Sequence, residues 1–430
     1  MNKKLFIICF TTILALSFCR TTDIKAALRD SDWNFKTTIT KTESRLKYYA
    51  YPSKNGKEAW VYRISGNVDT KGTTLSIPKA IDGRKVTRIG DANLLADPNA
   101  DERKNIISVT MEYWKKSSYS NQIKNVVIPD TVEVIEPCTF GGMPRVETIK
   151  IPKNVTKINE YTFYKCKRLK KVILPANLKE LNPLAFYQCP NLKTLKLSPK
   201  NTAFKLKGKF LITRKDNALV YAAASGKALN IPNGIKTIKQ NACNNVTAPV
   251  VHIPASVSTL EEDALTSLNI KDVTVAAGNK TFQKDGQCIY RKNDKSLAAA
   301  IADENLNLQI SENIEKITTE YSVVNYDRWN YTYLHSTIFP KNLKSVRYPG
   351  FSKLSNAKTV YFTGLTPPKL TIPKNNKWMY LGLAKLPIFC DLYVPKDSIK
   401  AYKAWYKKYE TNNGVKWHTF DGNIPKTETN

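Results

Sequence analysis

The chain has 430 residues, of which 42% are hydrophobic and 24% are charged. This much apolar material can form a core, so the composition excludes long-range disorder. Lysine and arginine number 67 against 36 acidic residues, and the resulting net charge of +31 favours an acidic partner, such as a glycan, a nucleic acid or a membrane surface. Only three histidines are present, which leaves little material for histidine-based catalysis or a metal centre.

Residues 1–26 have the order of regions that is typical of a secretory signal peptide. Lys3 and Lys4 precede an apolar run at residues 5–18, and polar residues follow it. This run is shorter than the roughly 20 residues that a membrane-spanning helix requires, and no later apolar stretch is longer. We therefore expect an exported protein, secreted or at the cell surface, with no transmembrane segment in the mature chain.

The end of the signal segment leaves the mode of export open. Cleavage after Cys19 or after Ala26 would release a free mature chain, whereas a lipid on Cys19 would anchor the protein to a membrane. The bulky Phe18 stands immediately before that cysteine, where a lipoprotein signal has a small residue. The sequence therefore favours free secretion over lipoprotein anchoring.

Beyond residues 27–74, which we expect to form a strand-rich N-terminal cap, a repeat of about 23 residues runs through most of the chain. Its marker is an apolar residue followed by proline, as at Ile128, Ile151 and Leu174. Further apolar residues recur 4, 7 and 12 positions after the marker. We count about 12 units between residues 75 and 395, with strands that end at residues 77, 128, 151, 174, 197, 231, 253, 275, 310, 339, 362 and 394.

The repeat predicts a solenoid of parallel strands. Each unit has a short apolar alternation before its proline, which is typical of a strand of about three to five residues, and the proline then ends the strand. One unit is too short to bury its own apolar positions. Stacked units align these positions into columns of one continuous core, with neighbouring strands paired at roughly 4.8 Å.

A longer duplication supports the repeat. Residues 201–238 match residues 279–317, and Phe204 and Phe282 lie at equivalent positions of the two copies. Gly208 and Gly286 follow these phenylalanines at the same spacing. Both copies have the pattern of a β-hairpin, so we expect a hairpin inserted into the solenoid at each place.

The unit from Leu169 to Cys189 follows the pattern L-x-x-V-x-I-P-x-x-V-x-x-I-x-x-x-x-F-x-x-C almost column for column, with Leu174 before the proline and Leu178 and Leu181 at the V-x-x-I positions. With these columns the repeat resembles the BspA-like (Treponema pallidum type) leucine-rich repeat family, and the ends of the chain are similar to secreted or surface members from gut Bacteroidetes. The resemblance implies an α/β repeat solenoid, a right-handed parallel-strand solenoid of the leucine-rich-repeat class with inserted hairpins and a C-terminal capping helix. It also implies a surface-exposed binding protein, an adhesin for host or bacterial partners.

The two ends of the repeat region resemble the family as well. Residues 67–89, with Ile77-Pro78 and an Asp82-Gly83 turn, resemble its entry unit. In residues 396–430, which we expect to form a cap helix and a tail, apolar residues recur at helical spacing from Ile399 to Tyr409 and should cover the last coil. Irregular insertions near residues 96–122 and 320–336 interrupt the repeat.

The six cysteines that remain after processing fall in core columns of the repeat. Cys166 and Cys189 occupy one column, Cys243 replaces a phenylalanine, and Cys138 falls in the column of Tyr161. We therefore interpret the cysteines as small buried hydrophobic residues. A disulfide between Cys166 and Cys189 is an alternative, although side chains stacked in parallel meet its dihedral requirement poorly.

The strand positions that alternate with the core should form one exposed ladder, which we expect to be the concave binding face of the solenoid. Lysines gather on it over three successive coils, and His252 follows further along. Isolated lysines on a solvated face would look the same, so both interpretations stay open. The candidate partner-binding residues of the ladder are Lys150, Lys170, Lys171, Lys193, Lys196 and His252.

The insertion near residues 320–336 is rich in aromatic residues. Aromatic rings beside polar groups can stack on sugars or anchor a protein partner, but they can equally pack over the edge of a repeat. The candidate binding residues here are Tyr326, Trp329, Tyr331 and Tyr333.

These patterns together predict a non-enzymatic, exported binding protein that acts in cell-surface adhesion or in recognition of a host or partner protein. The expected partner is a host or bacterial surface protein or an acidic glycan, and not a nucleic acid. A carbohydrate-capture or envelope-structural protein is the alternative, and an enzyme with dispersed catalytic residues is a remote one. No catalytic motif, metal-ligand spacing or cofactor-binding loop occurs in the sequence, so no catalytic residue, metal or cofactor is expected.

Overall fold

The structure is a computed structural model, and it describes residues 33–34, 37–43, 46–66, 73–90, 106–107, 122–223, 226–267, 269–319, 321–324, 334–348, 354, 357–372, 390–409 and 414–422. The expected signal peptide lies outside the described residues, as do most of both irregular insertions. The chain divides into two compact units. Unit 1 comprises residues 1–215 and 220–223, and unit 2 comprises residues 216–219 and 224–430.

Unit 1 begins with a mainly antiparallel sheet. Strands β1 to β3 pair antiparallel in order, and β6 joins β3 in parallel and forms a hairpin with β5. The hairpin turn is Asp82-Gly83, with φ of 51° and 73°, the left-handed pair that a tight two-residue turn requires. The strands are β1 (Ile39–Glu43), β2 (Leu46–Pro52), β3 (Glu58–Gly66), β5 (Ala80–Ile81), β6 (Arg84–Ile89) and β7 (Ile106–Ile107), which pairs with β3.

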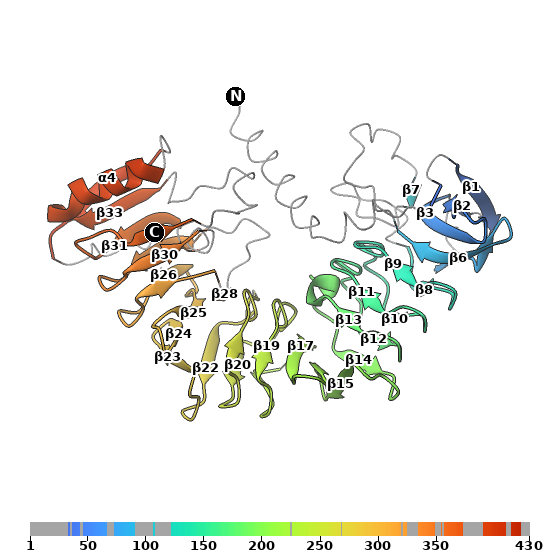
Figure 1. Cartoon of the computed structure of the whole chain (residues 1–430), viewed down its shortest axis with the longest axis horizontal. Coiled ribbons are helices and arrows are strands. Elements are labelled where there is room, and N and C mark those ends of the chain that lie inside the picture. Colours follow the sequence, from blue (N-terminus) through green and yellow to red (C-terminus); the bar gives the residue numbers. More distant parts are fainter. Residues whose placement is uncertain are drawn as a thin grey trace. The chain divides into compact units, whose positions relative to one another are not determined.

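The repeats of unit 1 form two parallel ladders (Figure 1). In the main ladder, Val172 pairs with Leu195, its equivalent in the next repeat. Residues one sequence period apart therefore lie opposite each other on neighbouring strands. The strands of the main ladder are β4 (Thr74–Ser76) and β8 (Asn125–Val127), which pair with each other, and β10 (Thr148–Lys150), β12 (Lys171–Leu174) and β14 (Thr194–Leu197), which pair in that order. The second ladder has two-residue strands: β9 (Val134–Ile135), which pairs with β6, and β11 (Lys157–Ile158) and β13 (Glu180–Leu181), which pair with each other. A 3-10 helix, η2 (Pro183–Phe186), follows β13.

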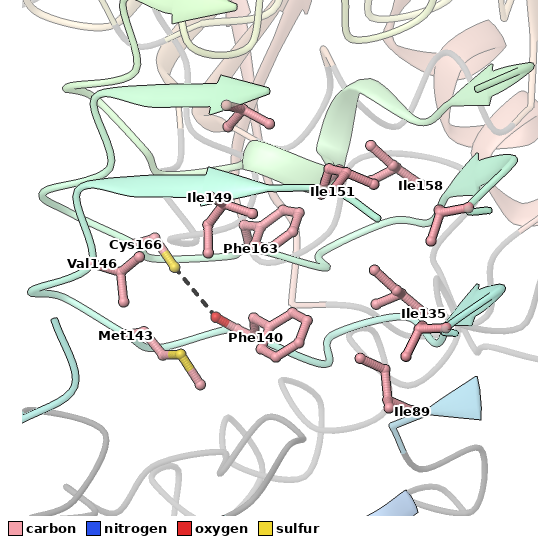
Figure 2. Close-up of a cluster of buried hydrophobic side chains, with 14 of the residues drawn as sticks. Ile89, Ile135, Phe140, Met143, Val146, Ile149, Ile151, Ile158, Phe163 and Cys166 are labelled. Carbon is pink, nitrogen blue, oxygen red and sulfur yellow. Dashed lines mark hydrogen bonds between the residues drawn. The ribbon is translucent and has the colours of Figure 1, made fainter. Parts of the chain in front are cut away.

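The core of unit 1 lies between these ladders and is built of stacked columns. Phe140, Phe163 and Phe186 come from successive coils, and their rings stack with centroids 5.8 and 5.6 Å apart. Figure 2 shows two of these rings together with the isoleucines that fill the neighbouring columns. All three phenylalanines have zero solvent exposure. The expected core columns are therefore confirmed.

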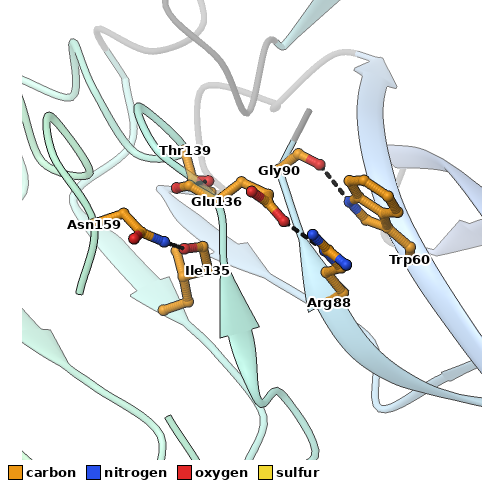
Figure 3. A network of polar contacts seen from close by, with 7 residues as sticks. All are labelled: Trp60, Arg88, Gly90, Ile135, Glu136, Thr139 and Asn159. Carbon is orange, nitrogen blue, oxygen red and sulfur yellow. Dashed lines mark hydrogen bonds and ion pairs between the residues drawn. The ribbon is translucent and has the colours of Figure 1, made fainter. Parts of the chain in front are cut away.

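A buried ion pair joins the first sheet to the first coil of unit 1. Arg88 of β6 contacts Glu136, which follows β9, at 2.5 Å between Nε and Oε1, and both side chains are nearly buried. The guanidinium also lies over the ring of Trp60, 4.1 Å from its centroid. Trp60 in turn donates a hydrogen bond from Nε1 to the carbonyl of Gly90 at 2.5 Å (Figure 3).

The two expected hairpins are present. Strands β15 (Phe204–Lys207) and β16 (Phe210–Thr213) pair antiparallel, as do β23 (Phe282–Asp285) and β24 (Cys288–Arg291). Each residue pair of the second hairpin is the counterpart of one in the first, beginning with Phe204–Thr213 and Phe282–Arg291. The duplication in the sequence is thus a duplication of structure.

Unit 2 repeats the pattern of two parallel ladders. The main ladder comprises β18 (Ala228–Asn230), β20 (Val250–Ile253) and β22 (Asp272–Val275), and then β26 (Asn307–Gln309), β29 (Leu334–Phe339), β31 (Ala357–Phe362), β33 (Asp391–Pro395) and β34 (Lys416–Phe420). The second ladder comprises β19 (Thr237–Ile238) and β21 (Thr259–Leu260), and then β27 (Lys316–Ile317), β30 (Ser345–Arg347) and β32 (Lys369–Thr371). The remaining strands of unit 2 are β25 (Leu297–Ile301) and β28 (Ser322–Val324), and strand β17 (Ala218–Ala222) has residues in both units.

The end of unit 2 carries the capping helix. A short 3-10 helix, η4 (Lys396–Ser398), leads into α4 (Ile399–Tyr409). Tyr402 and Trp405 pack on Phe362, with ring centroids 5.2 and 5.8 Å apart, and the Tyr402 hydroxyl donates to the carbonyl of Gly364 at 3.1 Å. The expected capping helix is confirmed, and one further parallel strand, β34, follows it.

The twelve expected strand ends agree with the structure. Each lies within one residue of the last residue of a main-ladder strand, from β4 to β33. The chain is therefore a parallel-strand solenoid with inserted hairpins and a C-terminal helix. Short strands and turns build most of each coil, so helical structure contributes less than an α/β description implies.

Candidate functional site

The lysines predicted to bind a partner in unit 1 lie on three neighbouring strands. The register places Lys150 of β10 opposite Ile173 of β12, and Ile173 opposite Lys196 of β14. Lys171 lies in the adjacent outward column, between two threonines. The side chains between these positions, such as Ile149 and Val172, point into the core and are buried. Alternation along each strand thus directs the lysines outward.

Two further predicted lysines lie where strands begin. The Lys193 amide donates to the carbonyl of Lys170 at 3.2 Å, so the two residues occupy one column on successive coils. Lys170 forms an exposed ion pair with Glu147 at 3.0 Å. Lys193 is exposed and forms no ion pair within the described residues.

We call the outward side of β10, β12 and β14 with Lys150, Lys171, Lys193 and Lys196 the lysine face. Three of these side chains are exposed and that of Lys171 is half-buried. In the part of the chain that the structure describes, none of the four has a carboxylate within ion-pair distance. The positive charge of this face is therefore not neutralised from within.

The basic excess of the whole chain is concentrated around this face. Residues 148–215 contain 17 lysine and arginine residues and only two acidic residues, Glu160 and Glu180. The segment thus carries +15 of the net charge of +31. Hairpin β15–β16 lies within it and adds Lys205, Lys207 and Lys209. Sequence reasoning noted the total charge and the stacked lysines, but it missed this concentration, which a count of charge along the chain reveals.

His252 belongs to unit 2 and lies at an outward position of β20. Its Nδ1 is hydrogen-bonded to Oγ1 of Thr274 on the next strand, at 2.5 Å. A shallow depression of about 450 Å³ lies beside the imidazole, with Asn233 and Ala255 also in its lining. The expected outward orientation is confirmed.

The predicted aromatic site residues Tyr326, Trp329, Tyr331 and Tyr333 lie outside the described residues. Tyr321, at the start of the same aromatic stretch, is described and has zero solvent exposure. Its backbone carbonyl accepts a hydrogen bond from the amide of Asp263 at 3.2 Å. Tyr321 is therefore a core residue of unit 2.

An aromatic column, which sequence reasoning missed, occupies the ladder at the end of unit 2. Tyr361 of β31, Tyr393 of β33 and His418 of β34 lie opposite one another. Their rings stack at 4.7 and 4.5 Å between centroids. His418 Nε2 contacts Oδ1 of Asp391 at 2.8 Å. Burial, followed by the nearby Tyr393 and Asp391, raises the pKa of the Tyr361 hydroxyl.

The sequence did contain a signal for this column. Tyr361 and Tyr393 each stand one residue before an expected strand end, as Lys150 does in its own unit. The candidate residues taken from the expected ladder end at His252, and Gln309, Ile338, Tyr361 and Tyr393 occupy later positions of it. A second group of outward side chains, different in chemistry from the lysine face, is therefore present.

All six cysteines that the structure describes are free and buried. The Cys166 thiol donates to the carbonyl of Phe140 at 3.3 Å (Figure 2). The Cys189 thiol donates in the same way to the carbonyl of Phe163 at 3.0 Å. Each thiol is thus used in a contact with the preceding coil. The interpretation as buried core residues is confirmed, and the disulfide alternative for Cys166 and Cys189 is wrong.

Two classes of site are not found among the described residues. No three side chains of His, Cys, Asp or Glu are grouped closely enough to hold a metal ion. No described helix has the length and apolar character needed to cross a membrane.

Comparisons with known proteins agree with this fold. Residues 113–207 and 216–319 match the BspA type leucine-rich repeat region, in six copies. No curated protein matches the chain.

Several solved structures resemble the chain. A leucine-rich cell surface protein of Faecalibacterium prausnitzii shares 15% identity, with 76% of this chain and 95% of that chain covered and a TM-score of 0.36. A leucine-rich-repeat protein of Bacteroides ovatus shares 12% identity, with coverages of 86% and 98% and a TM-score of 0.32. The pneumococcal vaccine antigen PcpA shares 14% identity, with coverages of 90% and 100% and a TM-score of 0.31. At these identities and TM-scores, the similarity does not bear on what this protein binds.

Proposed function

Because this chain contains a BspA-type leucine-rich-repeat region, we propose that it is an exported, non-enzymatic binding protein of the bacterial surface that serves in adhesion. Its ligand is an acidic glycan, such as a sulfated or sialylated polymer, held on the lysine face. The signal-peptide pattern and the repeat family support the location, and the lysine face supports the ligand.

One observation carries the ligand proposal. Four lysines without an anionic partner among the described residues lie on three successive coils, in a segment that holds +15 of the net charge. A solvated face that serves only solubility normally mixes both signs of charge. Here one carboxylate, Glu147, borders the face and pairs with Lys170, while the four lysines have no carboxylate partner among the described residues. The surface therefore attracts anions at a distance and offers several cations at close range.

The arrangement suits an extended polymer better than a small anion. Neighbouring parallel strands lie roughly 4.8 Å apart, so the Cα atoms of Lys150 and Lys196, two strands apart, are separated by roughly 10 Å. Lys171 lies on the strand between them. A chain of acidic sugars that runs along the stack could therefore contact several lysines in succession.

The same surface is poorly suited to single-stranded nucleic acid. Such proteins combine a basic groove with aromatic side chains on which the bases stack. Within the described residues, the outward positions between the lysines hold Thr148, Ile173 and Thr194, and no aromatic ring. The export signal also points away from a nucleic-acid partner.

The experiment compares two sets of lysines. In one variant Lys150, Lys171 and Lys196 are replaced by serine, and binding to a heparin-like polymer is measured at low and moderate salt. Because an exposed charge contact is worth up to about 1 kcal/mol, we expect the affinity at low salt to fall about 10- to 100-fold. The affinity of the wild-type protein should itself fall as salt screens the charges over about 8 Å.

The matched control removes the same amount of charge elsewhere in unit 1. Lys153, Lys167 and Lys179 are exposed and lie outside the lysine face, and their replacement by serine should change the affinity only slightly. Equal losses in the two variants would mean that the attraction is only the net charge of the chain. Retention of full binding by both would move the proposal from an acidic glycan to a surface protein as partner.

A further inference from the structure

The last strand of unit 2 leaves one edge of a parallel sheet open. The sheet runs β26, β29, β31, β33, β34, and within the described residues no strand pairs with the outer side of β34. Its five residues pair with β33 without a shift, from Asp391–Lys416 to Pro395–Phe420. An open edge of this kind is a template for another strand.

The register shows which backbone groups the edge offers. The amide of Lys416 donates to the carbonyl of Cys390 at 3.0 Å, so the backbone of Lys416 faces toward β33. In a strand, the N–H and C=O groups of alternate residues point to opposite sides. His418 and Phe420 therefore also bond to β33, and the amides and carbonyls of Trp417 and Thr419 point outward.

This edge has little of the protection that natural proteins give to exposed edge strands. Such edges usually carry a proline, a bulge or charged side chains that prevent pairing. Strand β34 has the sequence K-W-H-T-F, with no proline, and its continuous register with β33 contains no bulge. Lys416, at the start of the strand, is its only lysine or arginine. The edge is therefore competent to pair.

The side-chain columns that end on β34 indicate which side chains a segment that pairs with this strand would carry. The aromatic column ends at His418, whose side chain is 38% exposed and stacks on Tyr393 with its other face. In the neighbouring outward column, Lys416 lies opposite Asp391. The inward column ends at Trp417, opposite Leu392. A further strand would continue all three columns.

We propose that the outer edge of β34 binds an extended segment of a partner protein, which adds in parallel as one more strand. An acidic residue of that segment lies opposite Lys416, an apolar residue opposite Trp417 and an aromatic residue opposite His418. The sequence of β33, Asp391-Leu392-Tyr393, has this same acidic, apolar and aromatic order in its pairing with β34. Backbone hydrogen bonds supply affinity and the alternate side chains supply specificity.

This edge lies in unit 2, and its chemistry differs from that of the lysine face. It recognises a peptide backbone with one acidic group, whereas the lysine face attracts polyanions. The two proposals therefore stand or fall separately.

The test uses a labelled synthetic peptide with the sequence of residues 390–396, in which serine replaces Cys390, and fluorescence anisotropy on the full chain. We expect saturable binding to the wild-type protein. Thr419→Pro removes an outward N–H without removing a bond to β33, and proline is tolerated on such edges. This variant should bind at least about tenfold more weakly, because it loses a backbone hydrogen bond and adds a ring at the edge.

Two controls separate pairing from other effects. Thr419→Ala keeps the outward N–H and should bind as the wild type does, and the melting temperature of both variants should match that of the wild type. Lys416→Glu should weaken the binding of this peptide and should strengthen that of a peptide in which lysine replaces the residue equivalent to Asp391.

Three results would overturn the proposal. One is the absence of saturable binding to the wild-type protein at millimolar peptide. Another is equal binding by Thr419→Pro and Thr419→Ala. The third is a concentration-dependent dimer of the wild-type protein that Thr419→Pro abolishes, which would assign the edge to a second copy of the chain.

Discussion

A single buried asparagine organises each inserted hairpin. Asn201 Nδ2 donates to the carbonyls of Pro175 and Leu178 at 3.1 and 2.9 Å, and its Oδ1 accepts from the amide of Phe204 at 2.7 Å. Asn279, which occupies the same position in the second copy, makes the equivalent bonds there. One side chain thus satisfies backbone groups of both the preceding coil and the hairpin.

Replacing this asparagine should therefore lower the free energy of unfolding by more than the size of its side chain suggests. Asn201→Ala leaves several buried backbone groups without partners, and each such group costs about 1–3 kcal/mol. We expect a loss of about 2–4 kcal/mol in the free energy of unfolding, measured by urea denaturation. Thr202→Ala, at the exposed next position, should change it little. If the two variants had the same midpoint, the assigned role of Asn201 would be wrong.

The thiols are a second feature at the scale of single residues. Burial raises the pKa of Cys243, Cys288 and Cys390 to about 12, with smaller contributions from charged neighbours at the last two, and burial also raises that of Cys189. The reactive species is the thiolate. At pH 8 these thiols therefore stay protonated in the folded protein, and the unfolded chain ionises more readily.

A thiol-reactive disulfide reagent at pH 8 should detect this difference. In a form that begins at residue 27, which removes Cys9 and Cys19, we expect almost no reaction until a denaturant is added. The raised pKa values also mean that the folded state loses stability as the pH rises from about 9 toward 12, because the unfolded thiols ionise first. Rapid labelling of the native protein, or a stability that does not fall over this pH range, would contradict the assignment.

The junction between the first sheet and the first coil depends on contacts between whole elements. Strands β6 and β9 pair through only two residue pairs, Arg88–Val134 and Ile89–Ile135. The buried Arg88–Glu136 ion pair reinforces this short contact. An exposed pair, Lys85–Glu133 at 3.2 Å, joins the same elements and provides a natural comparison.

The two pairs should differ strongly in their effect on stability. Glu136→Ala removes the buried carboxylate that contacts the Arg88 guanidinium, and removal of one partner of a buried ion pair typically costs about 3–5 kcal/mol. Glu133→Ala breaks a pair whose side chains are both 48% exposed, and an exposed pair contributes at most about 1 kcal/mol. Thermal unfolding of the two variants measures the contrast. Equal melting temperatures would show that the buried pair does not hold the junction.

At the scale of the molecule, the repeat made most of the fold predictable. The register of the repeat is marked by the proline after each strand and by the apolar residues 4, 7 and 12 positions after the marker residue. The ends of the main strands and the buried phenylalanines could therefore be predicted from the sequence. The second ladder did not follow, because strands such as Lys157–Ile158 have only two residues and show no alternation. Strand β34 was missed because a capping helix normally marks the end of a solenoid.

The site was less predictable than the fold. The lysine face followed from the same alternation as the core, so Lys150, Lys171 and Lys196 were placed correctly on the outward side. The aromatic column was missed because the candidate residues were taken only from the earlier part of the ladder, up to His252, although Tyr361 and Tyr393 stand at the equivalent position of their own units. The polar role of Asn201 depends on the exact placement of backbone carbonyls 23 to 26 residues away, and no local pattern reports that.

The solenoid architecture also predicts how far along the chain a core substitution affects stability. Each coil packs only against its neighbours, so stability is approximately a sum of coil and interface contributions. Phe163 stacks between Phe140 and Phe186, and Phe163→Ala should cost about 3–5 kcal/mol by opening a cavity between coils. Local opening should then concentrate in the coils that share this column.

Amide hydrogen exchange followed by mass spectrometry can locate this effect. In Phe163→Ala we expect faster exchange over residues 125–197 and unchanged exchange over residues 307–362, many coils away in sequence. The matched variant Phe339→Ala removes a ring that stacks on Phe362 at 5.0 Å in unit 2, so it should give the reverse pattern. Lys153→Ala, at an exposed turn, should change neither region. If both phenylalanine variants accelerated exchange equally along the whole chain, the molecule would unfold as one cooperative block, and nearest-neighbour packing would not govern its stability.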